Sequence, residues 1–202
     1  MERETITRSM PSVRSAFEAW KENLREGRMA QAGNALFGEC LDWGDSLRTI
    51  YVGEGRDALA GRDPLTRFFV TRFRGMPVPA DIAAAPGHAV FLMAFTAFPY
   101  LDALVDELSL GEFEAAAADG GFTVRRVLAG EDEGDGALMP VRKADLGWSF
   151  DLMPVYRAKA LALDMYVATR HGGDFDDFLW AYVADHDLMF EMEQAWNPLT
   201  KG

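Results

Sequence analysis

The amino-terminal part of the chain has the hydrophobic spacing of a helix. Its apolar positions, separated by four, three and four residues, are Val13, Phe17, Trp20 and Leu24. This spacing places the four side chains on one face of a helix. Pro11, with Ser9 and Ser12 on either side, favours a helix start. Gly27 favours the end of this helix, and a second short helix is predicted over residues 28–37.

The stretch that follows mixes signals for strands and helices. Residues 40–52 predict two short extended pieces around a turn at Gly44. Residues 64–75 predict a helix, because Asp63 can cap its first backbone N–H groups and a proline stands in the first helical position. Residues 87–97 are apolar and bounded by turn residues, which favours a buried strand over a helix.

The second half of the chain contains the clearest strand signals. Residues 99–118 are compatible with either a helix or a strand edge, and the acidic, glycine-rich residues 131–136 predict the loop of a hairpin. Strands are expected over residues 122–129, 137–144 and 148–152. Two helices, over residues 156–170 and 175–196, are expected at the end of the chain, the first of them ending at Gly172.

Length and composition agree with one globular domain of the α+β class. The chain has 202 residues, of which 49% are hydrophobic and 26% charged, a mixture that supports a sizeable core. Its single cysteine, Cys40, excludes an internal disulfide and a cysteine-based zinc site. Without an apolar run of about 20 residues or a signal-like start, a cytoplasmic protein is the expectation.

The charge of the chain is strongly acidic and unevenly placed. The net charge is −12, and residues 75–135 alone hold eleven acidic residues against Arg125 and Arg126. Such a field repels polyanions, so nucleic acids and anionic membranes are not expected as partners. The exception is a basic cluster formed by Arg62, Arg67, Arg72 and Arg74. We interpret this cluster as the solvated face of an amphipathic helix, with an anion-binding patch as the alternative.

Three segments, taken in order, resemble the SnoaL-like branch of the nuclear transport factor two-like superfamily. They are Phe17-x-Ala-Trp20-x3-Leu24-x2-Gly27, Gly61-Arg-Asp-Pro-Leu-Thr-Arg-Phe-Phe69 and Gly147-Trp-Ser-Phe150. The resemblance implies a curved antiparallel sheet wrapped around N-terminal helices, forming a cone with an apolar pocket. It implies a cone-shaped domain over residues 1–153, with residues 154–202 as an added C-terminal helical extension packed on it. Ketosteroid isomerases, polyketide cyclases and dehydratases belong to this family.

Proton transfer in such a cone needs a carboxylate or histidine and an oxyanion donor facing an apolar cavity. Asp42 and Asp45 are the candidate bases, and His88 and Tyr51 are candidate partners. The alternative is structural: Asp42 faces solvent, Asp45 lies in a turn and His88 caps a strand end. The aromatic residues expected to line the pocket are Trp43, Tyr51, Phe69, Phe91, Trp148 and Phe150.

Histidine and aspartate residues near the carboxyl terminus suggest a metal site at first sight. They are His171, Asp174, Asp177 and His186, and oxygen and imidazole ligands of this kind suit zinc, manganese or iron. Helix capping by Asp174 explains most of the pattern, with Asp177 in the favourable first turn and His186 in the middle of the last helix. We therefore expect neither a metal nor a cofactor. Cys40 stands in an acidic, apolar setting, which indicates a core thiol.

Two functions remain open at this point. The leading hypothesis is a protein that binds a small apolar molecule, as an isomerase, cyclase or dehydratase or without chemistry. The alternative is a non-enzymatic acidic interaction protein, of the inhibitor or immunity type, that docks on a basic protein. A homodimer through the C-terminal helices is a further expectation. The last predicted helix offers apolar side chains for it, namely Trp180, Met189, Phe190, Met192 and Trp196.

Overall fold

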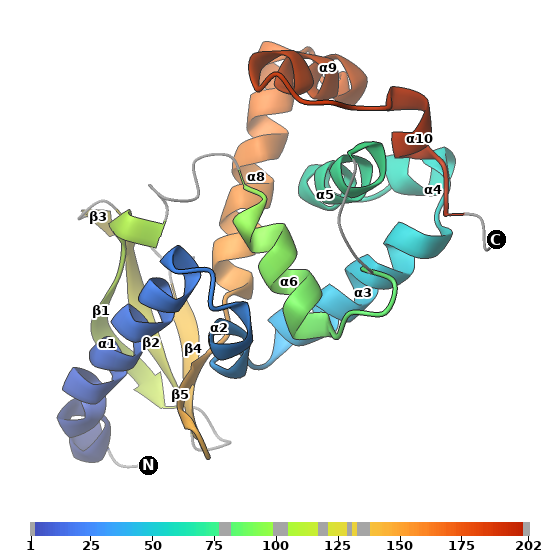
Figure 1. Ribbon diagram of the computed structural model, residues 1–202. Coiled ribbons are helices and arrows are strands. Elements are labelled where there is room, and N and C mark those ends of the chain that lie inside the picture. The colour runs from blue at the N-terminus through green and yellow to red at the C-terminus, as the bar shows by residue number, and fades with distance from the viewer. Residues whose placement is uncertain are drawn as a thin grey trace. The chain divides into compact units, whose positions relative to one another are not determined.

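The computed structural model describes residues 3–76, 82–98, 105–116, 121–128, 131–132 and 138–199 (Figure 1). Its helices and antiparallel sheet confirm the α+β class. The chain divides into two compact units, each built from two stretches, which differs from the predicted division at residue 153. The sheet unit holds Met1–Trp43 and Phe91–Tyr156, and the helical unit holds Gly44–Val90 and Arg157–Gly202. The chain passes between the units within helices α3, α6 and α8.

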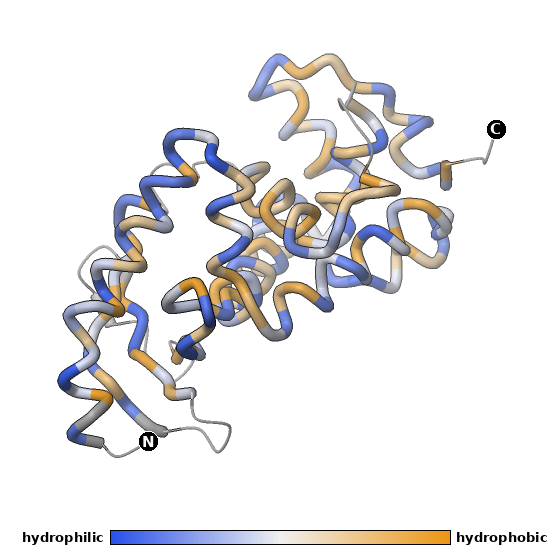
Figure 2. The backbone as a smooth tube through the Cα atoms, turned by 60° about the horizontal axis from the view of Figure 1, so that its bottom comes forward, coloured by the Kyte–Doolittle hydropathy of each residue, from blue (hydrophilic) through white to orange (hydrophobic). Residues whose placement is uncertain are grey.

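Helix α1 (Arg3–Arg25) of the sheet unit begins well before the predicted start at Pro11. The apolar stripe continues towards the amino terminus through Met10 and Ile6, which are both buried. Proline inside a helix removes one hydrogen bond and costs about 3 kcal/mol, and burial of the longer stripe offsets this cost. In Figure 2 the tube that starts beside the N label shows the mixed hydrophilic and hydrophobic colouring of an amphipathic helix.

Two segments predicted as extended are helical. Residues 40–52 belong to α3 (Glu39–Gly53), which follows the short α2 (Met29–Asn34). The prediction of a turn at Gly44 was wrong because this glycine permits a close approach instead. A Cβ atom at Gly44 would lie 2.0 Å from the carbonyl oxygen of Gly87.

The predicted strand over residues 87–97 is helix α6 (Gly87–Thr96). Val90, Phe91 and Leu92 are consecutive and buried, as are Ala94 and Phe95. A helix that is buried on all sides has no polar face, so hydrophobic periodicity cannot distinguish it from a buried strand. This physical ambiguity explains the error.

The sheet of the sheet unit is open and antiparallel over the described residues, in the order β1-β2-β4-β5, with β3 paired to β2. Its strands are β1 (Leu108–Ala116), β2 (Phe122–Leu128), β3 (Glu131–Asp132), β4 (Leu138–Ala144) and β5 (Gly147–Phe150). The strands predicted at 122–129, 137–144 and 148–152 are thus confirmed within a few residues. Within the uncertain region 99–118, residues 108–116 form a strand, and 99–104 and 117–118 lie outside the described residues.

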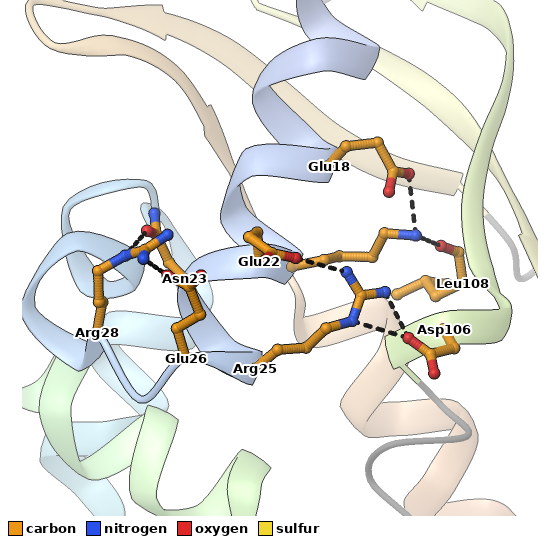
Figure 3. A network of polar contacts seen from close by, with 9 residues as sticks. Glu18, Glu22, Asn23, Arg25, Glu26, Arg28, Asp106 and Leu108 are labelled. Atoms are coloured by element: carbon orange, nitrogen blue, oxygen red, sulfur yellow. Dashed lines mark hydrogen bonds and ion pairs between the residues drawn. The ribbon is translucent and has the colours of Figure 1, made fainter.

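The outer edge of β1 is covered by basic side chains of α1. Lys21, which is buried, donates from Nζ to the Leu108 carbonyl oxygen at 3.0 Å and pairs with Glu18 at 2.9 Å (Figure 3). Arg14 donates to the Leu110 carbonyl at 3.3 Å, and Arg25 donates to Asp106 at 2.8 Å (Figure 3). Lys21 and Arg14 thus bind carbonyl groups of β1 that would otherwise be free to pair with another strand.

The helical unit contains the remaining helices. They are α4 (Arg56–Ala60), α5 (Pro64–Gly75), α8 (Met153–Arg170, from Arg157 on), α9 (Phe175–Asp185) and α10 (Met192–Trp196). Helix α5 matches its prediction, because Asp63 accepts hydrogen bonds from the Leu65 and Thr66 backbone N–H groups at 3.1 and 3.0 Å. The single helix predicted over residues 175–196 is interrupted, since Asp187 adopts a positive φ of 48°.

Candidate functional site

The residues expected to perform proton transfer lie on helices. Asp42 and Asp45 are exposed on α3, not on a strand that lines a pocket, and Asp45 pairs with Arg48 on the next turn at 2.8 Å. His88 is half-buried in the first turn of α6. Asp42 belongs to the sheet unit, whereas Asp45 and His88 belong to the helical unit. Their role as catalytic residues stays a prediction. The extended segment that was expected to place Asp42 and Asp45 beside a pocket is a helix.

The aromatic residues expected to line a pocket take part in core packing within their own units. In the sheet unit Trp43 contacts Phe91, with ring centroids 5.8 Å apart, and Phe150 contacts Phe17 at 5.1 Å. Trp148 of the same unit packs on Phe122 at 5.6 Å and donates from Nε1 to the Ser12 hydroxyl at 3.0 Å. In the helical unit Phe69 stacks on Phe73, which in turn contacts Tyr51. A ligand-lining role for these residues stays a prediction.

Trp20 in the sheet unit is buried with an unused hydrogen-bond donor. Its ring lies against Phe17 and Phe95, with centroid separations of 5.4 and 5.9 Å. The side chain is 1% exposed, and its indole Nε1 has no hydrogen-bond partner among the residues that the structure describes. Buried N–H groups are usually paired, so this donor is an unusual feature of the aromatic core.

Arginine residues of the basic cluster make hydrogen bonds and ring contacts with other residues of the helical unit. Arg74 is 1% exposed and donates to the backbone carbonyls of Ile50 and Tyr51 at 2.9 and 2.7 Å, which caps the end of α3. Burial lowers the pKa of this guanidinium group. Arg67 lies over the ring of Phe175 at 4.6 Å. The prediction of a solvated helix face is therefore wrong for Arg74.

The C-terminal histidine and aspartate residues lie at or near the ends of helices. The carboxylate of Asp174 accepts from the Asp176 and Asp177 backbone N–H groups at 2.9 and 3.1 Å, as expected for a cap. His171 Nδ1 lies 2.7 Å from an oxygen of Asp177. His186 stands at the end of α9 and not in mid-helix as predicted. Within the described residues, no three histidine, cysteine, aspartate or glutamate side chains are grouped so that they could hold a metal ion.

Cys40 is a core thiol. Its side chain is fully buried, and Sγ donates to the Phe37 carbonyl oxygen at 2.9 Å. Burial, with the nearby carboxylate of Asp151 as a second cause, raises the pKa of the thiol to about 12. Because the thiolate is the reactive form, the folded protein keeps this cysteine inert.

Three exposed large apolar side chains of the helical unit lie on α8. Leu161, Met165 and Tyr166 are 62, 60 and 50% exposed. We define the α8 face as the exposed residues Leu161, Ala162, Met165, Tyr166, Ala168 and Thr169. At 3.6 residues per turn these six positions fall within an arc of about 160° that holds no charged residue. Val167, on the opposite side of the helix, is buried.

Sequence reasoning missed this surface and favoured the last helix instead. Trp180 and Met189 are indeed exposed, but Trp196 is buried and Phe190 packs directly on Gly75. The available signal was the apolar run of residues 160–168 in α8, which only Asp164 interrupts.

Comparisons of the chain with family models, with curated proteins and with solved structures found no match. In the described part of the chain, no helix combines the length and the hydrophobicity that a membrane span requires.

Proposed function

We propose that this chain is a non-enzymatic protein-interaction protein that docks on its partner through the α8 face. The observation that carries the proposal is the exposure of Leu161, Met165 and Tyr166 on one uncharged side of a helix. Burying one such side chain contributes about 1.5–3 kcal/mol. Exposed apolar patches of this kind mark interaction sites more often than chance placement does.

The placement of the acidic candidates also favours interaction over proton transfer. A general base for a carbon acid works in an apolar pocket, where burial tunes its pKa towards neutral pH. Asp42 and Asp45 are exposed on α3, and Asp45 is paired with Arg48. An exposed carboxylate lacks the desolvation that such catalysis requires.

Site-specific crosslinking tests the proposal. A photo-reactive benzoylphenylalanine in place of Met165 is expected to give a discrete crosslinked product in the cells in which the protein occurs naturally. Adding Leu161→Glu should reduce the yield about tenfold or more, because it removes one buried side chain and places a charge in the contact.

The matched control places the same photo-reactive residue at Thr49, which is exposed on α3 of the same unit. Equal yields at positions 49 and 165, or a product at 165 that persists with Leu161→Glu, would contradict docking through the α8 face.

A second candidate function is binding of a small apolar molecule in the sheet unit, as the SnoaL-like resemblance implies. The unpartnered Nε1 of Trp20 supports it, since an acceptor oxygen on a ligand would satisfy this buried donor. A thermal-shift screen against steroids, polyketide-like aromatics and fatty acids is the test. A ligand at 100 times its dissociation constant adds about 2.7 kcal/mol, which corresponds to roughly 5–10 °C at this chain length.

The matched variant for that screen is Trp20→Phe, which keeps an aromatic ring and removes the donor. It should reduce the shift produced by ligands with an acceptor oxygen. If none of these compounds changes the melting temperature, or if Trp20→Phe responds as the wild type does, the sheet unit does not bind ligands in this way.

A further inference from the structure

We propose that the C-terminal arm of this chain, residues 188–199, exchanges between two copies, so that the arm of each copy docks on helix α5 of the other. In the structure the arm folds back onto α5 of its own chain, and α10 lies beside α5 (Figure 1). Exchange of an identical element is a low-cost route to a symmetric dimer, because the dimer reuses contacts that the single chain already makes. The arm and the helices α4, α5 and α9 that it contacts belong to the helical unit. The inference goes beyond the proposed function, since it does not use the α8 face.

The arm fits a site at the end of α5. The ring of Phe190 lies on Gly75, where a Cβ atom would be only 2.5 and 2.7 Å from the ring atoms Cε2 and Cε1. The backbone N–H of Glu191 donates to the carbonyl oxygen of Gly75 at 2.8 Å. The last carbonyl groups of a helix have no partner within the helix, so this bond satisfies one of them. Because every copy carries the same glycine with the same terminal carbonyl group, every copy can receive the arm of another.

Trp196 is the second anchor of the arm. Its side chain is 6% exposed, its ring centroid lies 5.9 Å from that of Phe175, and the Arg56 guanidinium group lies 4.6 Å from it. Phe175 begins α9 and Arg56 begins α4, so both stay in place when the arm detaches. The indole Nε1 of Trp196 has no hydrogen-bond partner among the residues that the structure describes. Docking therefore deprives this donor of water without replacing it, which makes the arm easier to release.

Residues 186–187 form the hinge of the arm, and the sequence favours a different conformation there. No glycine or proline stands between Phe175 and Trp196, so the chain predicts one continuous helix between them. The structure ends this helix at Asp185, and Asp187 has a φ of 48°. Among the described residues it is the only non-glycine residue with a positive φ, a conformation that a Cβ atom disfavours. A straight hinge relieves this strain and carries the arm away from its own α5, towards a second copy.

The hinge provides the first test. Sedimentation equilibrium of the full chain, refolded at high concentration, should show a mass that rises with concentration from 22.4 kDa towards twice that value. Asp187→Ala favours the straight helix, whereas Asp187→Gly accepts the positive φ and favours the folded-back arm. The alanine variant should therefore dimerise at least about 100-fold more tightly than the glycine variant, because each dimer contains two hinges. Residue 187 is exposed, so neither substitution disturbs the core.

A contact between chains identifies the exchanged arm directly. Isotope-labelled and unlabelled chains are mixed, unfolded and refolded together at high concentration. Isotope-filtered NMR should then detect a nuclear Overhauser effect between the Phe190 ring of one chain and the Gly75 α-protons of the other, since this ring lies on this glycine. A dimer whose arms stay folded back has the contact only within each chain and gives no filtered signal.

The outcomes separate this inference from the proposed function. Leu161→Glu, which places a charge in the α8 face, should leave the exchanged dimer unchanged. If Leu161→Glu dissociates the dimer instead, the dimer forms through the α8 face, so arm exchange is overturned while the proposed function stands.

Two further results would overturn arm exchange. One is a chain that stays monomeric at every concentration even with Asp187→Ala, or that forms a dimer without the filtered signal between Phe190 and Gly75. The other is an equal dissociation constant for the alanine and glycine variants at position 187, because the hinge then does not decide between the two conformations.

Discussion

Replacing Gly44 by alanine is expected to lower the free energy of unfolding by about 3 kcal/mol, near the upper end of the range for overpacked sites. The added Cβ would lie 2.0 Å from the carbonyl oxygen of Gly87 and 2.7 Å from its carbonyl carbon. Both groups are backbone, so no side chain can rotate away. Within the helical unit, α3 and the start of α6 must separate to admit the methyl group. Thermal unfolding should show a drop of roughly 6–12 °C.

The same helix supplies the control. Gly53, the last residue of α3, is exposed, and a Cβ there would have no atom within 4 Å. Gly53→Ala should therefore be neutral or stabilise the fold by up to about 1 kcal/mol, through the lower entropy of the unfolded chain. If both substitutions change the melting temperature equally, the close approach of Gly44 to Gly87 does not determine the packing of α3.

Replacing Asp151 by alanine is expected to cost about 3 kcal/mol. This carboxylate in the sheet unit is 5% exposed and accepts from the backbone N–H groups of Glu39 at 2.9 Å and Met153 at 3.1 Å. One side chain thus holds the starts of α3 and α8. Alanine leaves both donors without this acceptor, and the loss is largest for the buried Met153 N–H, since a buried unsatisfied donor costs about 1–3 kcal/mol. Chemical denaturation should show the loss as a lower midpoint at an unchanged slope.

Two variants sharpen this prediction. Asp151→Asn keeps one acceptor oxygen and turns a donor towards the second N–H group, so its stability should fall between those of the wild type and the alanine variant. Asp145→Ala, in the exposed turn before β5, should change stability by less than about 0.5 kcal/mol. An alanine variant at position 151 that is as stable as the one at position 145 would show that Asp151 does not hold the two helix starts.

Local signals allowed several elements to be predicted from the sequence. The start of α5 follows from Asp63 and the adjoining proline, and the start of α9 follows from Asp174. Both caps depend on atoms within three residues of the helix, so nothing distant can override them. Strands β2 and β4 were equally clear, since alternation and turn residues are local properties.

The candidate site was predicted less well, because burial and secondary structure there depend on distant residues. The glycine at position 44 looked like a turn residue until Gly87 was seen to fill the space beside it. Likewise, Arg74 looked like one member of a solvated row, but the carbonyl groups at the end of α3 bind it in the core. In both cases the contacting residues are too far apart in the sequence for a local pattern to predict the contact.

The sequence by itself therefore determined the α+β class, the capped helices and strands β2, β4 and β5, since short-range hydrogen bonding and periodicity specify them. Only the tertiary structure decided that residues 40–52 and 87–96 are helical and that Leu161, Met165 and Tyr166 are exposed. The physical reason is that the apolar character of a segment predicts that it will be buried, but does not predict which other residues will cover it. Which residues cover the segment is determined by packing between side chains that are far apart in the chain.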